Sequence, residues 1–361
     1  MRPSWAEIDL RAVAHNVEAF TAHLGDTDLC AVVKADAYGH GDVPVAETAL
    51  DHGASWLAVA LLEEGIRLRE ADITAPILLL SEPRLEDAAL TAEWDLTPTV
   101  YRPVFLEALA EHRERIPAVH VKVDTGMHRV GADPRTATSL VHQARAMGVR
   151  VGGVWTHFAS SESDADFTEF QASLLEAFVD DVREALDEDV IIHHANTGAA
   201  MLRGGGGMAR VGLGIYGLYP SEACRPVIDL QPAMRIVSHV SHVRRLPGGA
   251  RPSYGRTREL AGEATVATVP IGYADGVPRL LSDVGMVLIG GARRPLAGTV
   301  TMDQIVVDCG DDPVEVGDEV VLMGHQGDGV VTADEWATLT ATINYEIVCG
   351  VGPRLPRRFI E

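Results

Sequence analysis

Residues 29–41, LCAVVKADAYGHG, join a short apolar run to a single lysine, Lys34, which is followed by small and polar residues. Residues 118–131, AVHVKVDTGMHRVG, repeat this arrangement around Lys122. By their periodicity both apolar runs are predicted to be buried strands that end in loops. The two segments therefore favour an α/β fold in which strand ends carry reactive groups.

Six further apolar runs of the same kind occur before residue 220, at residues 55–60, 76–81, 96–100, 151–158, 190–195 and 209–217. Segments with helical periodicity lie between them, at residues 43–53, 63–71, 102–115, 136–148 and 170–186. Eight strands, each followed by a helix, predict a (β/α)8 TIM-type barrel over residues 1–230. The functional groups of such barrels come from the carboxyl ends of the strands, where we expect Lys34, Lys122, His157, Asn196 and Arg210.

From about Met234 the pattern changes to short strands and tight turns marked by GG, GD and DG dipeptides. The predicted strands lie within residues 234–246, 263–274, 285–291, 293–301, 304–309 and 318–324, and one short helix is predicted at residues 332–340. We therefore expect a smaller, mainly β C-terminal domain over residues 231–361. The strand-like residues 4–10, SWAEIDL, need not belong to the barrel and are a candidate for pairing with this second domain.

The bulk composition is that of a folded globular protein, with 47% hydrophobic and 23% charged residues. The net charge is −22 and the arginines form no basic stripe, which argues against nucleic acid or an anionic membrane as a partner. The first ten residues lack the apolar region of a signal peptide, and no apolar run approaches a membrane span of about 20 residues. We therefore expect a cytoplasmic protein.

The four cysteines, Cys30, Cys224, Cys309 and Cys349, are far apart in the sequence. They form no C-x-x-C motif and no Cys/His spacing typical of a zinc site, so neither a metal centre nor a disulfide framework is expected. The default expectation is four buried thiols.

Lysine is rare in this chain: only Lys34 and Lys122 among the 30 basic residues are lysines. Arginine stays protonated, whereas an amine can be neutralised, form a Schiff base or take up carbon dioxide. Each lysine is therefore a candidate for nucleophilic chemistry, and the alternative is that both survive by chance on loops.

Nine segments, together with SWAEIDLRAVAHN at residues 4–16 and GPRLPRRF at 352–359, carry a resemblance to a known family. The nine are VVKADAYGHG (32–41), VKVDTGMHRVG (121–131), THFA (156–159), HHANTGA (193–199), RVGLGIYGLYP (210–220), PSYGRT (252–257), IGYADG (271–276), TMDQ (301–304) and INYE (343–346). In order and approximate spacing the chain resembles the alanine racemases, which are fold-type III isomerases that use pyridoxal 5′-phosphate. The resemblance implies racemisation of alanine, supplying D-alanine for peptidoglycan.

Racemisation removes a proton from one face of Cα and returns one to the other face, so it needs two opposed acid/base groups. The resemblance implies that Lys34 holds the cofactor as a Schiff base and then serves the face of D-alanine. It implies that Tyr254 is the opposing base for L-alanine. A tyrosine needs hydrogen-bonding partners for this role, and the resemblance places His157 beside Tyr254 and Arg210 beside His157.

The same resemblance assigns the supporting groups. Arg210 faces the pyridine nitrogen, and Arg129 holds the phenolic oxygen of the cofactor and the substrate carboxylate. Lys122 carries a carbamate that positions Arg129; the alternative is an unmodified ammonium paired with a carboxylate. The remaining cofactor-binding positions are Tyr38, Asn196, Thr197, Gly212, Leu213 and Tyr345. The remaining substrate or entrance positions are Tyr273, Met302 and Asp303.

The family also implies a homodimer with shared active sites, in which Tyr254, Tyr273, Met302 and Asp303 reach the partner's cofactor. Alternative functions are a serine or broad-specificity racemase, a non-catalytic pyridoxal-phosphate carrier, a fold-type III decarboxylase and a structural protein. The chain departs from the usual pattern in TMDQ, where CMDQ is commoner, and at Thr197, where serine is common. The glycine run 204–207 is expected to be a flexible surface loop.

Overall fold

The computed structural model describes residues 2–361, which form two compact units. The barrel unit comprises Ala12–Ala37 and Gly41–Gln231. The β unit comprises the residues up to Arg11, Tyr38–His40 and Pro232–Glu361. The residues that follow Lys34 therefore pass from one unit to the other and back.

The barrel unit is built on one parallel sheet of eight strands in the order β8-β7-β6-β5-β4-β3-β2-β9. The strands are β2 (Asp28–Val32), β3 (Trp56–Val59), β4 (Ile77–Leu79), β5 (Thr97–Val100), β6 (Val119–Lys122), β7 (Val151–Trp155), β8 (Ile191–His193) and β9 (Met208–Val211). An isolated bridge between His193 and Gly206 connects the two ends of the order, so the barrel is nearly closed. All eight predicted strands are confirmed.

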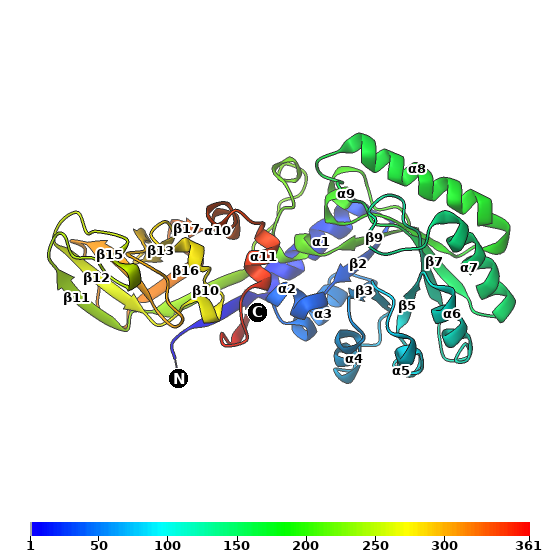
Figure 1. Ribbon diagram of the computed structural model, residues 1–361, viewed down its shortest axis with the longest axis horizontal. Helices are drawn as coiled ribbons and strands as arrows, with labels where there is room; N and C mark the ends of the chain where they lie inside the picture. The colour runs from blue at the N-terminus through cyan, green and yellow to red at the C-terminus, as the bar shows by residue number, and fades with distance from the viewer. Residues whose placement is uncertain (1) are drawn as a thin grey trace. The chain divides into compact units, whose positions relative to one another are not determined.

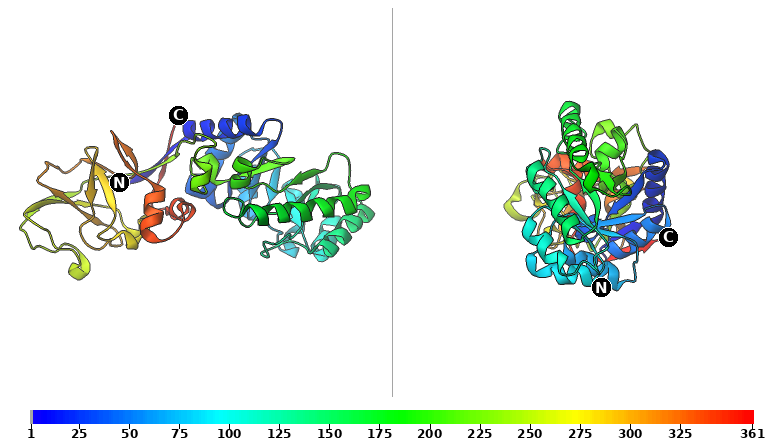
Figure 2. Two further views of the ribbon diagram at one scale, coloured as in Figure 1. Left: turned by 90° about the horizontal axis from the view of Figure 1, so that it is seen from above. Right: turned by 90° about the vertical axis from the view of Figure 1, so that its right-hand side faces the viewer.

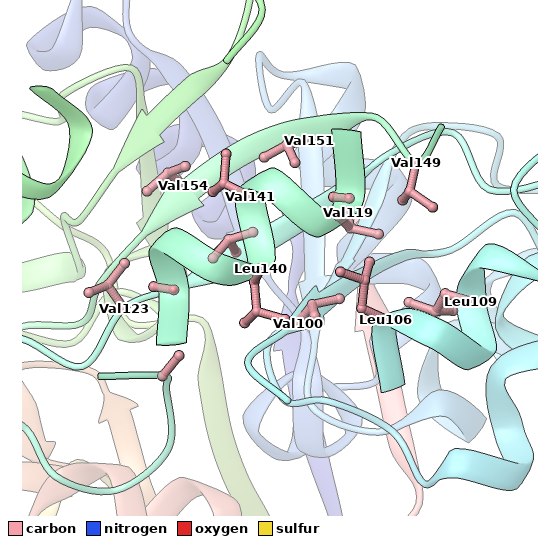
Figure 3. Close-up of a cluster of buried hydrophobic side chains, with 14 of the residues drawn as sticks. Val100, Leu106, Leu109, Val119, Val123, Leu140, Val141, Val149, Val151 and Val154 are labelled. Carbon is pink, nitrogen blue, oxygen red and sulfur yellow. The ribbon is translucent and has the colours of Figure 1, made fainter. Parts of the chain in front are cut away.

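The helices between the strands cover the outside of the sheet (Figures 1 and 2). They are α3 (Asp42–Asp51), α4 (Leu62–Glu70), α5 (Ala88–Glu93), α6 (Pro103–Ala110), α7 (Pro134–Met147), α8 (Ala165–Val182) and α9 (Thr197–Leu202). Figure 3 shows one part of the resulting core, where Leu106 and Leu109 of α6 and Leu140 of α7 pack around Val100 and Val119. Each fully buried leucine contributes about 2 kcal/mol of hydrophobic stabilisation.

One part of the barrel prediction was wrong. The eighth strand, β9, is followed by a 3-10 helix, Leu213–Tyr216, and not by an α-helix. Instead α1 (Leu10–Leu24), which precedes the first barrel strand, packs there, and its Asn16 donates a hydrogen bond of 3.2 Å to the Ile215 carbonyl. Gly214 has no side chain, which leaves room for Phe20 of α1. The apolar run 209–217 therefore describes a strand only as far as Val211.

The β unit contains a seven-stranded sheet and a three-stranded sheet. The first contains β14 (Ala292–Pro295), β13 (Met286–Ile289), β16 (Glu319–Gln326), β10 (Met234–His239), β1 (Trp5–Asp9), β18 (Arg357–Ile360) and β17 (Gly329–Val331). The second contains β11 (His242–Leu246), β12 (Ala264–Val269) and β15 (Ile305–Gly310). Strand β1 pairs antiparallel with β10 and parallel with β18, so Trp5–Asp9 lie inside this sheet.

Three expectations for the chain outside the barrel strands need correction. The β unit has a second helix, α11 (Asn344–Cys349), after the predicted α10 (Ala333–Thr340), because six residues are too short to show helical periodicity. Cys349 is exposed, whereas the other three cysteines are buried. The glycine run 204–207 is a loop with Gly206 and Gly207 exposed, as expected, but it is anchored: the amide of Gly207 donates to the Ile192 carbonyl at 3.0 Å, and Gly205 is buried.

Within residues 2–361 no helix is both long enough and apolar enough to cross a membrane.

Candidate active site

The predicted site residues of the barrel unit lie at the carboxyl ends of its strands. Lys34 follows β2, Lys122 is the last residue of β6, and His157 lies two residues after β7. Asn196 is the N-cap of α9 after β8, and Arg210 lies in β9. The carboxyl ends of parallel barrel strands open at one mouth, so five strands contribute to the same site.

The backbone after Lys34 adopts an unusual conformation. Element α2 (Lys34–Gly39) has φ of 54°, 55°, 50° and 54° at Ala35, Asp36, Ala37 and Tyr38, which is a left-handed helical turn. This conformation costs L-residues roughly 1–2 kcal/mol each, so surrounding contacts must hold it. The buried carboxylate of Glu64 accepts the amide of Ala35 at 2.7 Å as well as the amides at the start of its own helix. The turn thereby fixes the backbone at Lys34.

The Arg210 guanidinium is the centre of the polar network in the mouth. It is 3% exposed, and Nη1 donates to His193 Nδ1 at 2.7 Å. Nη2 contacts the Thr156 carbonyl at 3.0 Å and His157 Nδ1 at 3.2 Å. Within residues 2–361 no carboxylate pairs with it, and burial lowers its pKa to about 10. The side chain therefore remains a cation at neutral pH, held by neutral groups.

His157 is held in its neutral form. Burial lowers its pKa well below the ordinary value of 6.5, and the cations Arg210, Lys122, Arg129 and Lys34 lower it further. Because Arg210 can only donate, the Nδ1 of His157 must accept, which leaves its proton on Nε2. His157 can therefore donate from Nε2 to a further group.

Lys122 is a buried amine in an electropositive setting. It is 4% exposed, and its nitrogen lies over the Trp155 ring. Burial, followed by the charges of Arg210 and Arg129, lowers its pKa to about 7. In the described chain no carboxylate forms an ion pair with this nitrogen. The carboxylate of Asp124 acts on this amine and raises its pKa, but by less than burial and the charges of Arg210 and Arg129 lower it.

Arg129 lies on the exposed loop after β6. The side chain of Asp124 accepts the amides of Gly126 and His128, both at 3.0 Å, and so shapes this loop. The loop lies near the barrel mouth, since Arg129 contributes to the lowered pKa of both Lys122 and His157.

A group of backbone amides and a hydroxyl forms a cradle suited to an anion. Asn196 caps α9 by accepting the amide of Ala199 at 3.0 Å. The buried hydroxyl of Thr197 accepts the amide of Gly212 at 3.1 Å. Thr197 begins α9 and Leu213 begins a 3-10 helix, and the first amides of a helix have no acceptor within it. Such amides commonly bind phosphate.

These features fit pyridoxal 5′-phosphate, the cofactor that the resemblance implies. The cofactor is an anion, and Lys34, Lys122, Arg129 and Arg210 all act on His157 from within the barrel unit. The Thr197 cradle suits a phosphate, and the buried cation of Arg210 suits a ring nitrogen with a lone pair. The residues present therefore satisfy the chemistry of the group.

In the β unit, the predicted site residues are exposed on turns with fixed backbones. The Tyr254 side chain is 74% exposed, while its carbonyl accepts the Thr299 hydroxyl at 2.7 Å. The amide of Tyr273 donates to the Thr301 carbonyl at 3.0 Å, beside Met302. Asp303 accepts from Arg354 at 2.7 Å. Exposed apolar side chains on rigid turns are typical of a surface that a partner covers.

Tyr38 and Tyr345 are in contact within the β unit. Their ring centroids are 6.3 Å apart, and burial raises the pKa of the Tyr38 hydroxyl. The Tyr38 hydroxyl is therefore a protonated donor near neutral pH, as phosphate binding requires.

Two buried residues that organise the mouth were missed. His193 accepts from Arg210, and Gln171 of α8 connects two loops. The Gln171 amide nitrogen donates to the His157 carbonyl at 3.2 Å and to the Thr125 hydroxyl at 3.3 Å, and its oxygen accepts the Ala159 amide at 2.9 Å. The available signal was a polar residue on the buried face of a helix.

Comparisons with known proteins cover nearly the whole chain. The family models described as "Alanine racemase, N-terminal domain" and "Alanine racemase, C-terminal domain" match residues 8–220 and 233–359. Alanine racemases from Halothermothrix orenii and Symbiobacterium thermophilum are 41% and 43% identical, and each match covers 99% of this chain and 97% of the relative. The crystal structure of alanine racemase from Streptomyces lavendulae has a TM-score of 0.93 at 35% identity, covering 100% of this chain and 98% of that one.

Proposed function

This chain belongs to the alanine racemase family, and we propose that it racemises alanine by a two-base mechanism that depends on pyridoxal 5′-phosphate. The enzyme interconverts L-alanine and D-alanine. The observation that carries the site assignment is the group of basic side chains around neutral His157, with Arg210, Arg129 and Lys34 as its cations, which suits an anionic cofactor. We further propose that its D-alanine supplies cell-wall peptidoglycan.

The cofactor contacts follow from the chemistry of each group. Lys34 is the amine that would bind the cofactor covalently, because Lys122 is buried at the end of β6 with its nitrogen against the Trp155 ring. Thr197, Gly212 and Leu213 would hold the phosphate with Tyr38 and Tyr345. Asn196 supports Thr197 by capping α9. When bound, pyridoxal 5′-phosphate supplies an electron sink for the negative charge that develops at Cα.

Lys34 and Tyr254 are the proposed acid/base pair. The Lys34 amine would remove the Cα proton of D-alanine and return one when D-alanine is formed. The Tyr254 phenolic oxygen would do the same for L-alanine on the opposite face. Neutral His157 supports this assignment, because its Nε2 proton is available to a tyrosine oxygen.

Arg210 and Arg129 have different proposed roles. The buried guanidinium of Arg210 cannot give up its proton at neutral pH, so a ring nitrogen facing it would stay unprotonated. An unprotonated ring nitrogen would limit how far the negative charge at Cα spreads into the ring. It would thereby favour return of a proton to Cα over side reactions. Arg129 is exposed on its loop and would bind the alanine carboxylate, with the Met302 backbone alongside.

Lys122 is proposed to be carbamylated. A carbamate forms from a neutral amine and carbon dioxide, and the pKa of about 7 keeps much of this amine neutral near physiological pH. The modification would replace a cation without a carboxylate partner by an anion among Arg129 and Arg210. Its function would be to position Arg129.

We propose a homodimer with two shared sites. The exposed side chains of Tyr254, Tyr273 and Met302 support this assembly, because a partner chain would bury them. In this arrangement the β unit of one subunit completes the barrel mouth of the other, and Asp303 lies at the entrance.

The test is chiral chromatography of purified protein incubated with L-alanine, D-alanine or L-serine. We expect alanine to racemise in both directions. Hydroxylamine should remove the cofactor and abolish activity, and added pyridoxal 5′-phosphate should restore it. Activity that survives complete cofactor removal would contradict the proposal, and faster turnover of serine would reassign the substrate.

A further inference from the structure

A hydrogen-bonded chain of three buried side chains runs through the barrel interior. TIM-barrel interiors are ordinarily filled by branched apolar side chains, but here His120, His193 and Arg210 come from β6, β8 and β9 and are all buried. Arg210 Nη1 lies 2.7 Å from His193 Nδ1, and His193 Nε2 lies 3.0 Å from His120 Nδ1. His120 therefore lies two hydrogen bonds from the Arg210 guanidinium.

Because arginine can only donate hydrogen bonds, it determines which ring nitrogen carries the proton in both histidines. Arg210 has no acceptor, so His193 Nδ1 must carry a lone pair and His193 a proton on Nε2. That proton is donated to His120 Nδ1, which leaves the His120 proton on its own Nε2. Burial, then the charge of Arg210, lowers the pKa of both imidazoles, that of His120 to about 3. Both rings are therefore neutral.

The neighbouring residues Gly153 and Trp155 leave room for the His120–His193 contact and support it. Gly153 of β7 pairs with His120 across the sheet, and a Cβ at Gly153 would lie 2.5 Å from His120 Nδ1. Only a glycine leaves the space in which His120 meets His193. On its other side His193 stacks on Trp155, with centroids 5.5 Å apart and planes inclined by 10°. The ring of His193 is thus clamped between Trp155 and its two hydrogen bonds.

We propose that His120 is a positioning residue for the active site, acting through His193 on Arg210. By accepting the Nε2 proton of His193, it stops that ring from turning and keeps Nδ1 directed at Arg210. Arg210 then presents Nη2 to His157. The inference rests on the proposed function, because it assigns part of the machinery that holds the cofactor-facing guanidinium.

Three substitutions at His120 separate this role from simple packing. In His120→Asn the amide oxygen occupies the place of Nδ1 and can still accept from His193. In His120→Gln the amide is displaced to the place of Nε2, and in His120→Leu there is no acceptor. Gly153→Ala intrudes on the same contact without replacing either histidine.

The first measurement uses cofactor-free protein labelled with 15N-histidine. Two-bond proton–nitrogen correlations should show His193 and His120 neutral, with the proton on Nε2, throughout pH 5 to 8. His120→Asn should keep the His193 pattern, whereas His120→Gln, His120→Leu and Gly153→Ala should shift or broaden it. A proton on Nδ1 of either ring in the wild type, or an unchanged His193 pattern in all four variants, would overturn the proposal.

The second measurement is steady-state kinetics at saturating cofactor. We expect kcat in both directions to fall roughly tenfold in His120→Gln and in Gly153→Ala, and to be largely retained in His120→Asn. The KM for alanine should change little, because His120 does not contact substrate. Equal kcat in His120→Asn and His120→Gln would contradict positioning through an acceptor. Failure of the wild-type protein to racemise alanine would instead refute the proposed function. The tautomer measurement would still test the His120–His193–Arg210 contacts, because it does not depend on activity.

Discussion

The amine nitrogen of Lys122 lies 4.1 Å from the centroid of the Trp155 ring, against an aromatic face and not a carboxylate. The Arg210 guanidinium contacts the same ring at 4.5 Å. Two cationic groups therefore share one indole, and the lysine is the one that can become neutral. The aromatic face by itself attracts a cation, but burial and the charges of Arg210 and Arg129 outweigh it and lower the pKa of Lys122.

Carbamylation of Lys122 should depend on pH and on bicarbonate. Because the pKa of Lys122 is lowered to about 7, the amine is mostly neutral above that pH and mostly ammonium below it. We expect intact-mass spectra in bicarbonate at pH 8 to show one added carbon dioxide, which is lost as the pH falls below about 6. Lys122→Met protein is the control and should show no addition. An unmodified wild-type mass at pH 8 would eliminate the carbamate.

Lys34 should be the single site of covalent cofactor attachment. Borohydride reduction followed by peptide mapping should find the label on residues 29–41, and Lys34→Ala should be colourless. The matched control is Lys122→Met, which should remain coloured. A label on Lys122 would reverse the assignment.

Tyr254→Phe should abolish racemisation in both directions, because each enantiomer needs one group as base and the other as acid. The variant should still bind cofactor and alanine. In D₂O, proton NMR should show exchange at Cα of D-alanine with retained configuration and much slower exchange of L-alanine. Equal exchange from both enantiomers would mean that one group serves both faces.

A shared active site predicts complementation between two inactive variants. Mixed dimers of Lys34→Ala and Tyr254→Phe should recover part of the activity, since one of their two sites contains both intact groups. Recovery is measured after co-expression with different affinity tags, so that the mixed dimer can be purified. An inactive mixed dimer would argue that each site is built from a single chain.

Gln171, whose side chain is fully buried, should contribute to stability and turnover. Gln171→Met preserves the length of the side chain and removes its hydrogen bonds to His157, Ala159 and Thr125. Each buried polar group left without a partner costs about 1–3 kcal/mol, so we expect a lower free energy of unfolding and a lower kcat. Gln143→Met on α7 is the matched control. Equal urea midpoints for the two variants would contradict this role.

The barrel strands were predictable because strands covered on both faces are continuous apolar runs. The same rule failed at residues 213–216, where an apolar run continues through a glycine-containing 3-10 helix. Helix α11 was missed because its six residues span less than two turns. The local sequence indicates which segments are buried and what hydrophobic period they have. It does not indicate which short apolar segments form a helix.

The predicted site positions came from a resemblance, and the structure adds groups that no local pattern marks. His120, His193 and Gln171 occupy buried positions of a strand or helix, where a sequence contains no sign of a polar partner. Their partners lie 73, 17 and 14 residues away along the chain, in His193, Arg210 and His157. Only the folded barrel unit brings these pairs together.

Because a left-handed turn follows Lys34, the position of this lysine depends on the surrounding structure and not on its local sequence alone. A sequence selected only for conformational ease would hold glycine at positions 35–38, yet the chain holds Ala, Asp, Ala and Tyr there. Copying residues 34–39 into another barrel would therefore transfer the amine and not its placement. A designer would also need to transplant Glu64 with its helix, because its carboxylate receives the amide of Ala35.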